Sequence, residues 1–273
     1  MHIGEKKVNE VKIQLMNYDE VGFREKEIRN LSELPTQSLR KGVTWINVTG
    51  LHDSALIHGI GDLFGIHPLT LEDIVNTRQR PKTEEFKNYL YLVLRMLSFD
   101  PEWGRVQSEQ VSFILGKGFL ISFQERDGDI FISVRERIRK AGGRIRSYGA
   151  DYLLYALTDA VVDQYFLILE DIGERLNAVE DDLLQQLTPS LLETIHHLKQ
   201  ESLHLNRQVW PLREVLVQLT REKMRFIEES TGIFFRDIYD HTIQVIEGVE
   251  IERDLLSGIL DLYVSMNSNR LNE

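Results

Sequence analysis

The sequence contains no cysteine among its 273 residues and only six prolines. The absence of cysteine excludes disulfide bridges, thiolate zinc sites, iron–sulfur clusters and cysteine nucleophiles. Positive charge is also scarce, because 32 Lys and Arg face 43 Asp and Glu and leave a net charge of −11. Since so acidic a chain repels nucleic acid phosphates and attracts cations, we expect no nucleic acid partner.

Uninterrupted apolar runs are missing as well. The N-terminus lacks the apolar core of a signal peptide. The most apolar stretch, residues 152–169, carries Asp159 and Asp163 near its middle, and each carboxylate would cost about 2.5–3.5 kcal/mol at the centre of a bilayer. We therefore expect no membrane-spanning segment within these residues. The common phosphate-loop, dinucleotide, zinc-protease and serine-hydrolase motifs are also missing, so an enzyme is not expected.

Proline and glycine concentrate in the first half of the chain and predict short elements joined by turns. Residues 1–148 are predicted to form an α/β (or α+β) domain with a small mixed sheet and helices. Runs rich in Val, Ile, Phe and Tyr predict strands, and amphipathic runs predict helices. The predicted strands are residues 11–16, 43–48, 89–97, 110–115 and 119–123, and the predicted helices are residues 54–64, 68–75 and 130–140.

The pattern becomes helical near residue 150 and stays so. We predict two antiparallel long helices within residues 149–230, broken at Thr188-Pro189, and a third long helix within 231–273. The third helix carries a seam of 3.5-residue period, interrupted only by Glu252. At about 1.5 Å per residue it would reach roughly 60 Å, so we expect it to project as a stalk. Its residues are Val245, Val249, Glu252, Leu256, Ile259, Tyr263 and Met266.

Acidic side chains offer three candidate metal sites. Mg²⁺ takes oxygen ligands and is often held by one or two carboxylates with water. Glu72 and Asp73 are adjacent in a predicted helix, and a solvated acidic turn is the simpler interpretation. Asp159 and Asp163 lie one turn apart on a helix predicted to be largely buried, where a carboxylate needs a metal, hydrogen-bond donors or an arginine. The arginines considered as partners are Arg135, Arg137 and Arg236.

The third acidic group combines Asp237 and Asp240 with His241, and Asp237 and His241 share one helical face. From the residues alone, a salt bridge or helix cap is the favoured interpretation of this group. On the second long helix, His197 and His204 are seven residues apart with Glu201 between them, a spacing that could hold Zn²⁺. A solvated or interhelical face is the favoured interpretation of these histidines, together with His196.

Several runs resemble the CorA family of magnesium channels, and the resemblance extends over almost the whole chain. The matching runs are residues 44–50, 64–74, 78–82, 210–214, 235–242 and 257–263. The resemblance implies a homopentamer shaped like a funnel, with an α/β domain, two antiparallel helices and one long stalk helix per subunit. It also implies a membrane protein whose soluble part is cytoplasmic, at the cell's inner (plasma) membrane.

The family also has two transmembrane helices and an outer-mouth Gly-Met-Asn loop, which these residues do not contain. We therefore expect the chain to represent the cytosolic metal-sensing and gating domain, cut just before the bilayer. Asn272 then matches a family position at the inner mouth of the pore.

The resemblance implies metal sites between subunits. Asp73 of one subunit and Asp237 of the next would bind Mg²⁺ or Co²⁺ and favour the closed state. A second site would use Glu72 and Asp159. Two alternatives stay open: a zinc-transporting relative within the same superfamily, and a soluble metal-dependent phosphohydrolase that uses the acidic residues.

Overall fold

The computed structural model describes residues 6–35, 42–100, 105–128, 130–185, 187–221 and 224–272. Within them lies one seven-stranded sheet with the order β2-β1-β3-β7-β6-β5-β4. Its strands β3 and β7 are parallel and all other neighbours are antiparallel. The strands are β1 (Lys12–Tyr18), β2 (Phe23–Ile28), β3 (Val43–Thr49), β4 (Lys82–Glu85), β5 (Tyr89–Asp100), β6 (Arg105–Gly116) and β7 (Phe119–Gln124).

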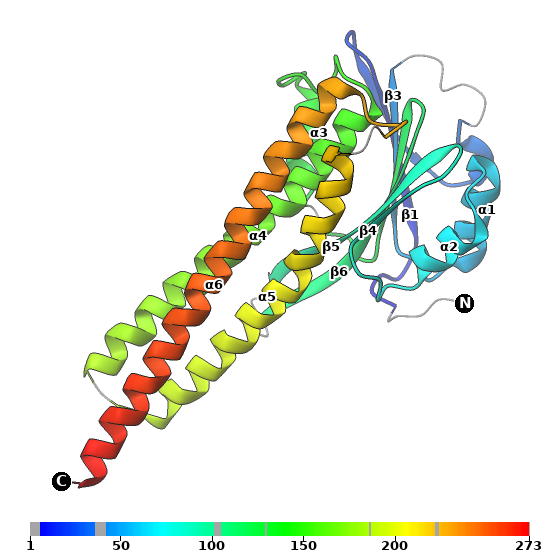
Figure 1. The fold of residues 1–273 in the computed structure, drawn as a ribbon. Helices are drawn as coiled ribbons and strands as arrows, with labels where there is room; N and C mark the ends of the chain where they lie inside the picture. Colours follow the sequence, from blue (N-terminus) through cyan, green and yellow to red (C-terminus); the bar gives the residue numbers. More distant parts are fainter. Residues whose placement is uncertain are drawn as a thin grey trace.

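The helices divide between the two faces of this sheet (Figure 1). On one face lie α1 (Ser54–Phe64) and α2 (Pro68–Val75), and on the other lie α3 (Ile132–Arg139) and α4 (Ala150–Gln185). Two further helices, α5 (Pro189–Arg221) and α6 (Glu229–Asn272), pack along α4. The mixed sheet followed by three long helices confirms the predicted fold class.

Strand alternation separates two apolar cores. Along β5, Leu90, Leu92 and Leu94 face the core shared with the long helices, whereas Tyr91 and Val93 face the core under α1 and α2. All five side chains are fully buried. Because successive side chains on a strand point to opposite faces, a continuous apolar run is what a sheet covered on both sides requires.

Local signals fix the short elements. Asp53 caps α1, since its carboxylate accepts from the Leu56 amide at 3.0 Å, and Gly65 ends the helix with φ of 65°. Pro68 opens α2 at a position where a missing N–H costs nothing. The hairpin between β6 and β7 turns through Lys117 and Gly118, whose φ of 81° suits glycine.

Two strands were not predicted. Strand β2 carries alternating charges and is exposed along five of its six residues, and β4 is a short polar segment. Both are edge strands of the sheet. Charged, short edges discourage pairing with other chains, and the same composition hides them from a search for apolar runs.

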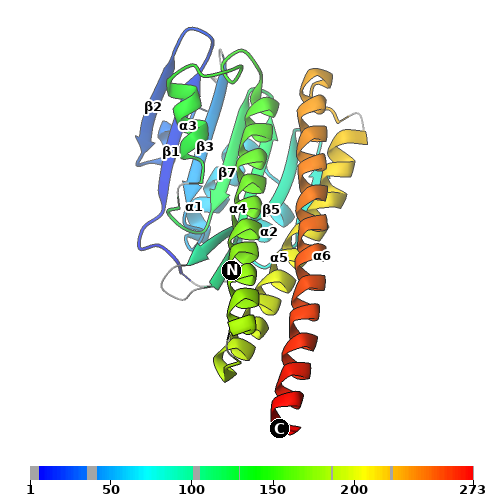
Figure 2. The same ribbon diagram turned by 90° about the vertical axis from the view of Figure 1, so that its left-hand side faces the viewer.

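The long helix α6 has the predicted seam, and its middle packs within the same chain. Val249, Leu256 and Tyr263 are buried within the same chain, where α6 packs against α4 and α5. The Tyr263 hydroxyl donates to the Thr188 carbonyl oxygen at 3.4 Å in the turn before α5. The neighbouring helices therefore cover most of the seam, and the projecting part is the C-terminal end of α6, which extends past its neighbours (Figures 1 and 2).

By length and composition, α4 is the one described helix that could span a membrane. The protein itself buries 67% of its most apolar window. Its apolar character is thus explained by packing between the sheet and the other long helices, which is consistent with the sequence expectation for residues 152–169.

Candidate metal centre

Asp73 lies on α2 and is held by two side chains from the loop and strand that follow. The Gln79 amide donates to Oδ1 at 2.8 Å, and the Lys82 ammonium contacts Oδ2 at 2.6 Å. The carboxyl side chain remains 24% exposed. The neighbouring Glu72 is exposed, so the two adjacent acids occupy different environments.

Lys82 would compete with a metal ion for the Asp73 carboxylate. Burial alone would lower the Lys82 pKa, but its hydrogen bonds to Asp73 and Glu84 leave the pKa raised. The ammonium is therefore charged at neutral pH, and a divalent cation at Asp73 has to displace it. Glu84, 2.8 Å from the same ammonium, offers Lys82 an alternative partner.

Asp159 and Asp237 lie on α4 and α6. One turn before them, the rings of Tyr155 and Phe234 pack with centroids 5.1 Å apart and fasten the two helices together. Asp159 and Asp237 then follow on the same faces, because residues three and four apart share one side of a helix. Asp237 is exposed and Asp159 is half-buried.

Burial raises the pKa of Asp159 to about 6. The charge of Asp163 adds to the increase, His241 and Arg137 oppose it, and Asp237 contributes least. None of the predicted arginine partners forms an ion pair with Asp159 within the described residues. A divalent cation would relieve the repulsion between these carboxylates.

One prediction about this region, the burial of Asp163, needs correction. Asp163 is exposed, because the burial along α4 is no longer all round once the helix passes Val162. Asp237 and His241 do lie one turn apart on α6, but the His241 ring packs edge-on against Phe166 with centroids 5.9 Å apart. Asp240 is exposed.

The second long helix does not assemble a zinc site. The Arg175 guanidinium lies 2.7 Å from Glu201 Oε2 and 3.4 Å from His197 Nδ1, so a cation already occupies the space between them. No three His, Asp or Glu side chains of the described residues are grouped as ligands for one ion. The favoured sequence interpretation, an interhelical polar face, agrees with this arrangement.

One chain does not bring Asp73 and Asp237 together. Helix α2 packs on one face of the sheet, whereas α6 belongs to the core on the other face. Asn272 is the last residue of α6. The described part of the structure includes its backbone and leaves out its side chain. The sequence analysis missed Gln79 and Lys82 as partners of Asp73, although both belong to the run 78–82 that carries part of the family resemblance.

Comparison with known proteins identifies the family. The family model described as "CorA-like Mg2+ transporter protein" matches residues 40–273. The cobalt/magnesium transport protein CorA of Thermotoga maritima is 45% identical over 261 residues, which are 96% of this chain and 74% of that protein. The chain belongs to the CorA family.

Solved structures show the same fold at low sequence identity. The CorA magnesium transporter of Methanocaldococcus jannaschii aligns with a TM-score of 0.79 at 17% identity and covers 95% of this chain and 78% of that one. The ZntB cytoplasmic domain of Vibrio parahaemolyticus aligns with a TM-score of 0.75 at 14% identity, covering 96% and 99%. The CorA fold therefore accommodates very different sequences.

Proposed function

We propose that this chain is the metal-sensing and gating part of a transporter for Mg²⁺ or Co²⁺, placed on the cytoplasmic side of the inner (plasma) membrane. Membership of the CorA family supports the transport of a divalent cation. The observation that carries the sensing role is the separation of Asp73 and Asp237 on opposite sides of one copy. A shared ion then requires a second copy.

In the proposed homopentamer, Asp73 of each copy faces Asp237 of the next. Two carboxylates and water suit Mg²⁺, which keeps most of its hydration shell and accepts oxygen ligands. Both carboxylates reach solvent in the single chain, so an arriving ion can contact them. Lys82 would turn to Glu84 when the ion binds at Asp73.

A second proposed site uses Glu72 and Asp159. Glu72 is exposed beside Asp73, and burial together with the charge of Asp163 raises the pKa of Asp159 to about 6 although His241 and Arg137 oppose the increase. A metal ion would add positive charge beside this carboxylate and stabilise its ionised form. Asn272, at the end of α6, would lie at the inner mouth of the pore in the complete transporter.

Regulation follows from the charges. With metal bound, each interface is bridged and the closed assembly is favoured. Without metal, like charges face each other across each interface, and the open state gains population. The size of this shift is set by how much more tightly the closed state binds metal than the open state does.

Mg²⁺ is favoured over Zn²⁺ as the ligand because the candidate donors are carboxylate oxygens, and the paired histidine region holds Arg175 instead. The likeness to ZntB concerns the fold alone. The family description is that of a transporter, which supports transport over hydrolysis.

The proposal is tested by thermal unfolding of the chain over a Mg²⁺ titration. An ion that binds only the assembled form at 100 times its dissociation constant adds about 2.7 kcal/mol, roughly 5–10 °C in melting temperature for a chain of this size. Asp73→Asn and Asp237→Asn should each remove most of this increase. The double variant should lose little more, because either change destroys the shared site.

The control is His197→Ala, which should keep the full response to Mg²⁺. Equal responses to Mg²⁺ in all five proteins would contradict the assignment. Loss of the response in the histidine variant alone would move the metal to α5 and favour zinc.

A further inference from the structure

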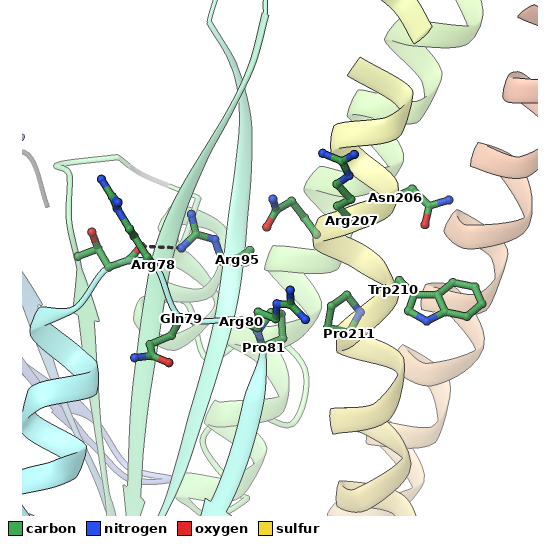
Figure 3. A pocket seen from close by; sticks show the side chains of 11 residues that line it. Arg78, Gln79, Arg80, Pro81, Arg95, Asn206, Arg207, Trp210 and Pro211 are labelled. Atoms are coloured by element: carbon green, nitrogen blue, oxygen red, sulfur yellow. Dashed lines mark hydrogen bonds between the residues drawn. The ribbon is translucent and has the colours of Figure 1, made fainter. Parts of the chain in front are cut away.

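Four arginines line a pocket between the sheet and α5, on a protein whose net charge is −11. Figure 3 shows Arg78, Arg80 and Arg95 on the sheet side and Arg207 on the facing helix. The pocket has a volume of about 650 Å³. This is within the usual range for small-molecule sites, about 300–1,000 Å³.

The pocket gathers positive charge without neutralising it. Arg78, Arg80 and Arg207 form no ion pair or side-chain hydrogen bond with any part of the chain that the structure describes. Arg95 donates to the Thr77 carbonyl oxygen at 2.8 Å and to the Ser108 hydroxyl at 3.0 Å, both neutral acceptors. An excess of guanidinium groups in one pocket is the arrangement that recognises phosphate or carboxylate groups.

Arg95 is held in place more firmly than the other three arginines of the pocket. Its guanidinium is partly buried between β5, β6 and the loop after α2, and burial lowers its pKa while Glu125 and Glu109 oppose this at longer range. The Tyr165 hydroxyl donates to the Arg95 carbonyl oxygen and anchors the same residue from α4. The other three arginines are exposed and can close on a ligand.

His204, on α5, also lies within the positive potential of these arginines. Its Nε2 is buried and has no hydrogen-bond partner among the described residues. Burial lowers the pKa of His204, and the charges of Arg95 and Arg207 lower it further. A bound anion would offset that potential.

We propose that this pocket binds a soluble anion with two or more phosphoryl groups, of the pyrophosphate or nucleoside-diphosphate class, through Arg78, Arg80, Arg95 and Arg207. A single phosphate would leave much of the volume empty, and the arginines come from both walls, which favours a ligand with more than one phosphoryl group. The Trp210 indole points away from the sheet-side arginines in Figure 3, so recognition rests on the phosphates. Pyrophosphate and ADP should therefore bind alike.

The test is isothermal titration calorimetry of the chain in metal-depleted buffer, because diphosphates chelate Mg²⁺. Pyrophosphate and ADP should give saturable binding that weakens as salt is added, and inorganic phosphate should bind at least tenfold more weakly. The variant Arg78→Gln with Arg207→Gln, one residue from each wall, should lose at least tenfold in affinity. Each charge-assisted hydrogen bond contributes enough for such a change.

The matched control changes Arg24→Gln and Arg29→Gln, two exposed arginines near the other end of the sheet that do not line this pocket. It removes the same charge and should bind as wild type does. Circular dichroism melts verify that both double variants fold. The proposal is overturned if wild type shows no saturable binding of pyrophosphate, or if the two double variants lose affinity equally. Binding of ADP but not pyrophosphate would likewise overturn recognition through phosphates.

Discussion

Glu252 is a buried carboxyl group in the middle of the α6 seam. It is 7% exposed, and its Oε2 has no hydrogen-bond partner within the described residues. Its other oxygen points at α4, where a Cβ added to Gly173 would lie 3.4 Å away. Burial raises the pKa of Glu252 to about 8 from an ordinary value of 4.5.

The raised pKa makes stability depend on pH with a definite sign. Between pH 4.5 and about 8 the folded chain keeps the Glu252 proton and the unfolded chain loses it. Raising the pH in this range therefore favours unfolding, by up to about 1.4 kcal/mol per pH unit. Between pH 4.5 and pH 7 the free energy of unfolding therefore falls by about 3 kcal/mol at most. Water that reaches the carboxyl group reduces this loss to roughly 2 kcal/mol.

Glu252→Gln keeps the shape and removes the proton equilibrium. We expect it to match wild type near pH 4.5 and to be more stable by roughly 2 kcal/mol at pH 7. Urea unfolding of both proteins between pH 4.5 and 8 in metal-free buffer measures this difference. Glu250→Gln, an exposed neighbour on the same helix, is the control and should show no pH-dependent gain. A difference between Glu252→Gln and wild type that stays constant with pH would refute the reasoning.

Three further changes have defined outcomes. Lys82→Met removes the cation that competes at Asp73, so the Mg²⁺ concentration at half-maximal thermal stabilisation should fall about three- to tenfold. Asp159→Asn should stabilise the metal-free chain at pH 7 by about 1 kcal/mol and lose that advantage below pH 4, because the raised pKa of about 6 makes the ionised form costly. Tyr165→Phe removes a buried hydrogen bond to the Arg95 carbonyl oxygen and should lower the free energy of unfolding by about 1–2 kcal/mol in urea titrations.

The apolar and helical patterns predicted most of the fold because they encode burial directly. Helices α1 and α2 begin and end at the predicted residues. Strands β2 and β4 were not predicted, because an edge strand needs few apolar residues. The period along α6 predicted a packed stripe but could not distinguish partners in the same chain from partners in another copy.

The candidate site was predictable only in part. Motifs pointed to Asp73 and Asp237 as candidates, yet the contact between Asp73 and Lys82 depends on how the loop after α2 returns along the sheet. The arginine pocket brings together residues more than 100 positions apart in the sequence, and no local sequence pattern predicts that they lie close in space. Burial of Asp159 against exposure of Asp163 depends on which side of α4 meets the sheet and α6.

The central claim is that one metal ion joins neighbouring copies through Asp73 and Asp237. Crystals of the chain grown with Co²⁺ and measured at the cobalt absorption edge test it most directly, because anomalous scattering locates the ion. The account predicts a peak between the Asp73 carboxylate of one copy and the Asp237 carboxylate of the next, and its loss in crystals of Asp237→Asn. Fully bound cobalt elsewhere, such as beside His197, with no peak between these carboxylates would contradict it.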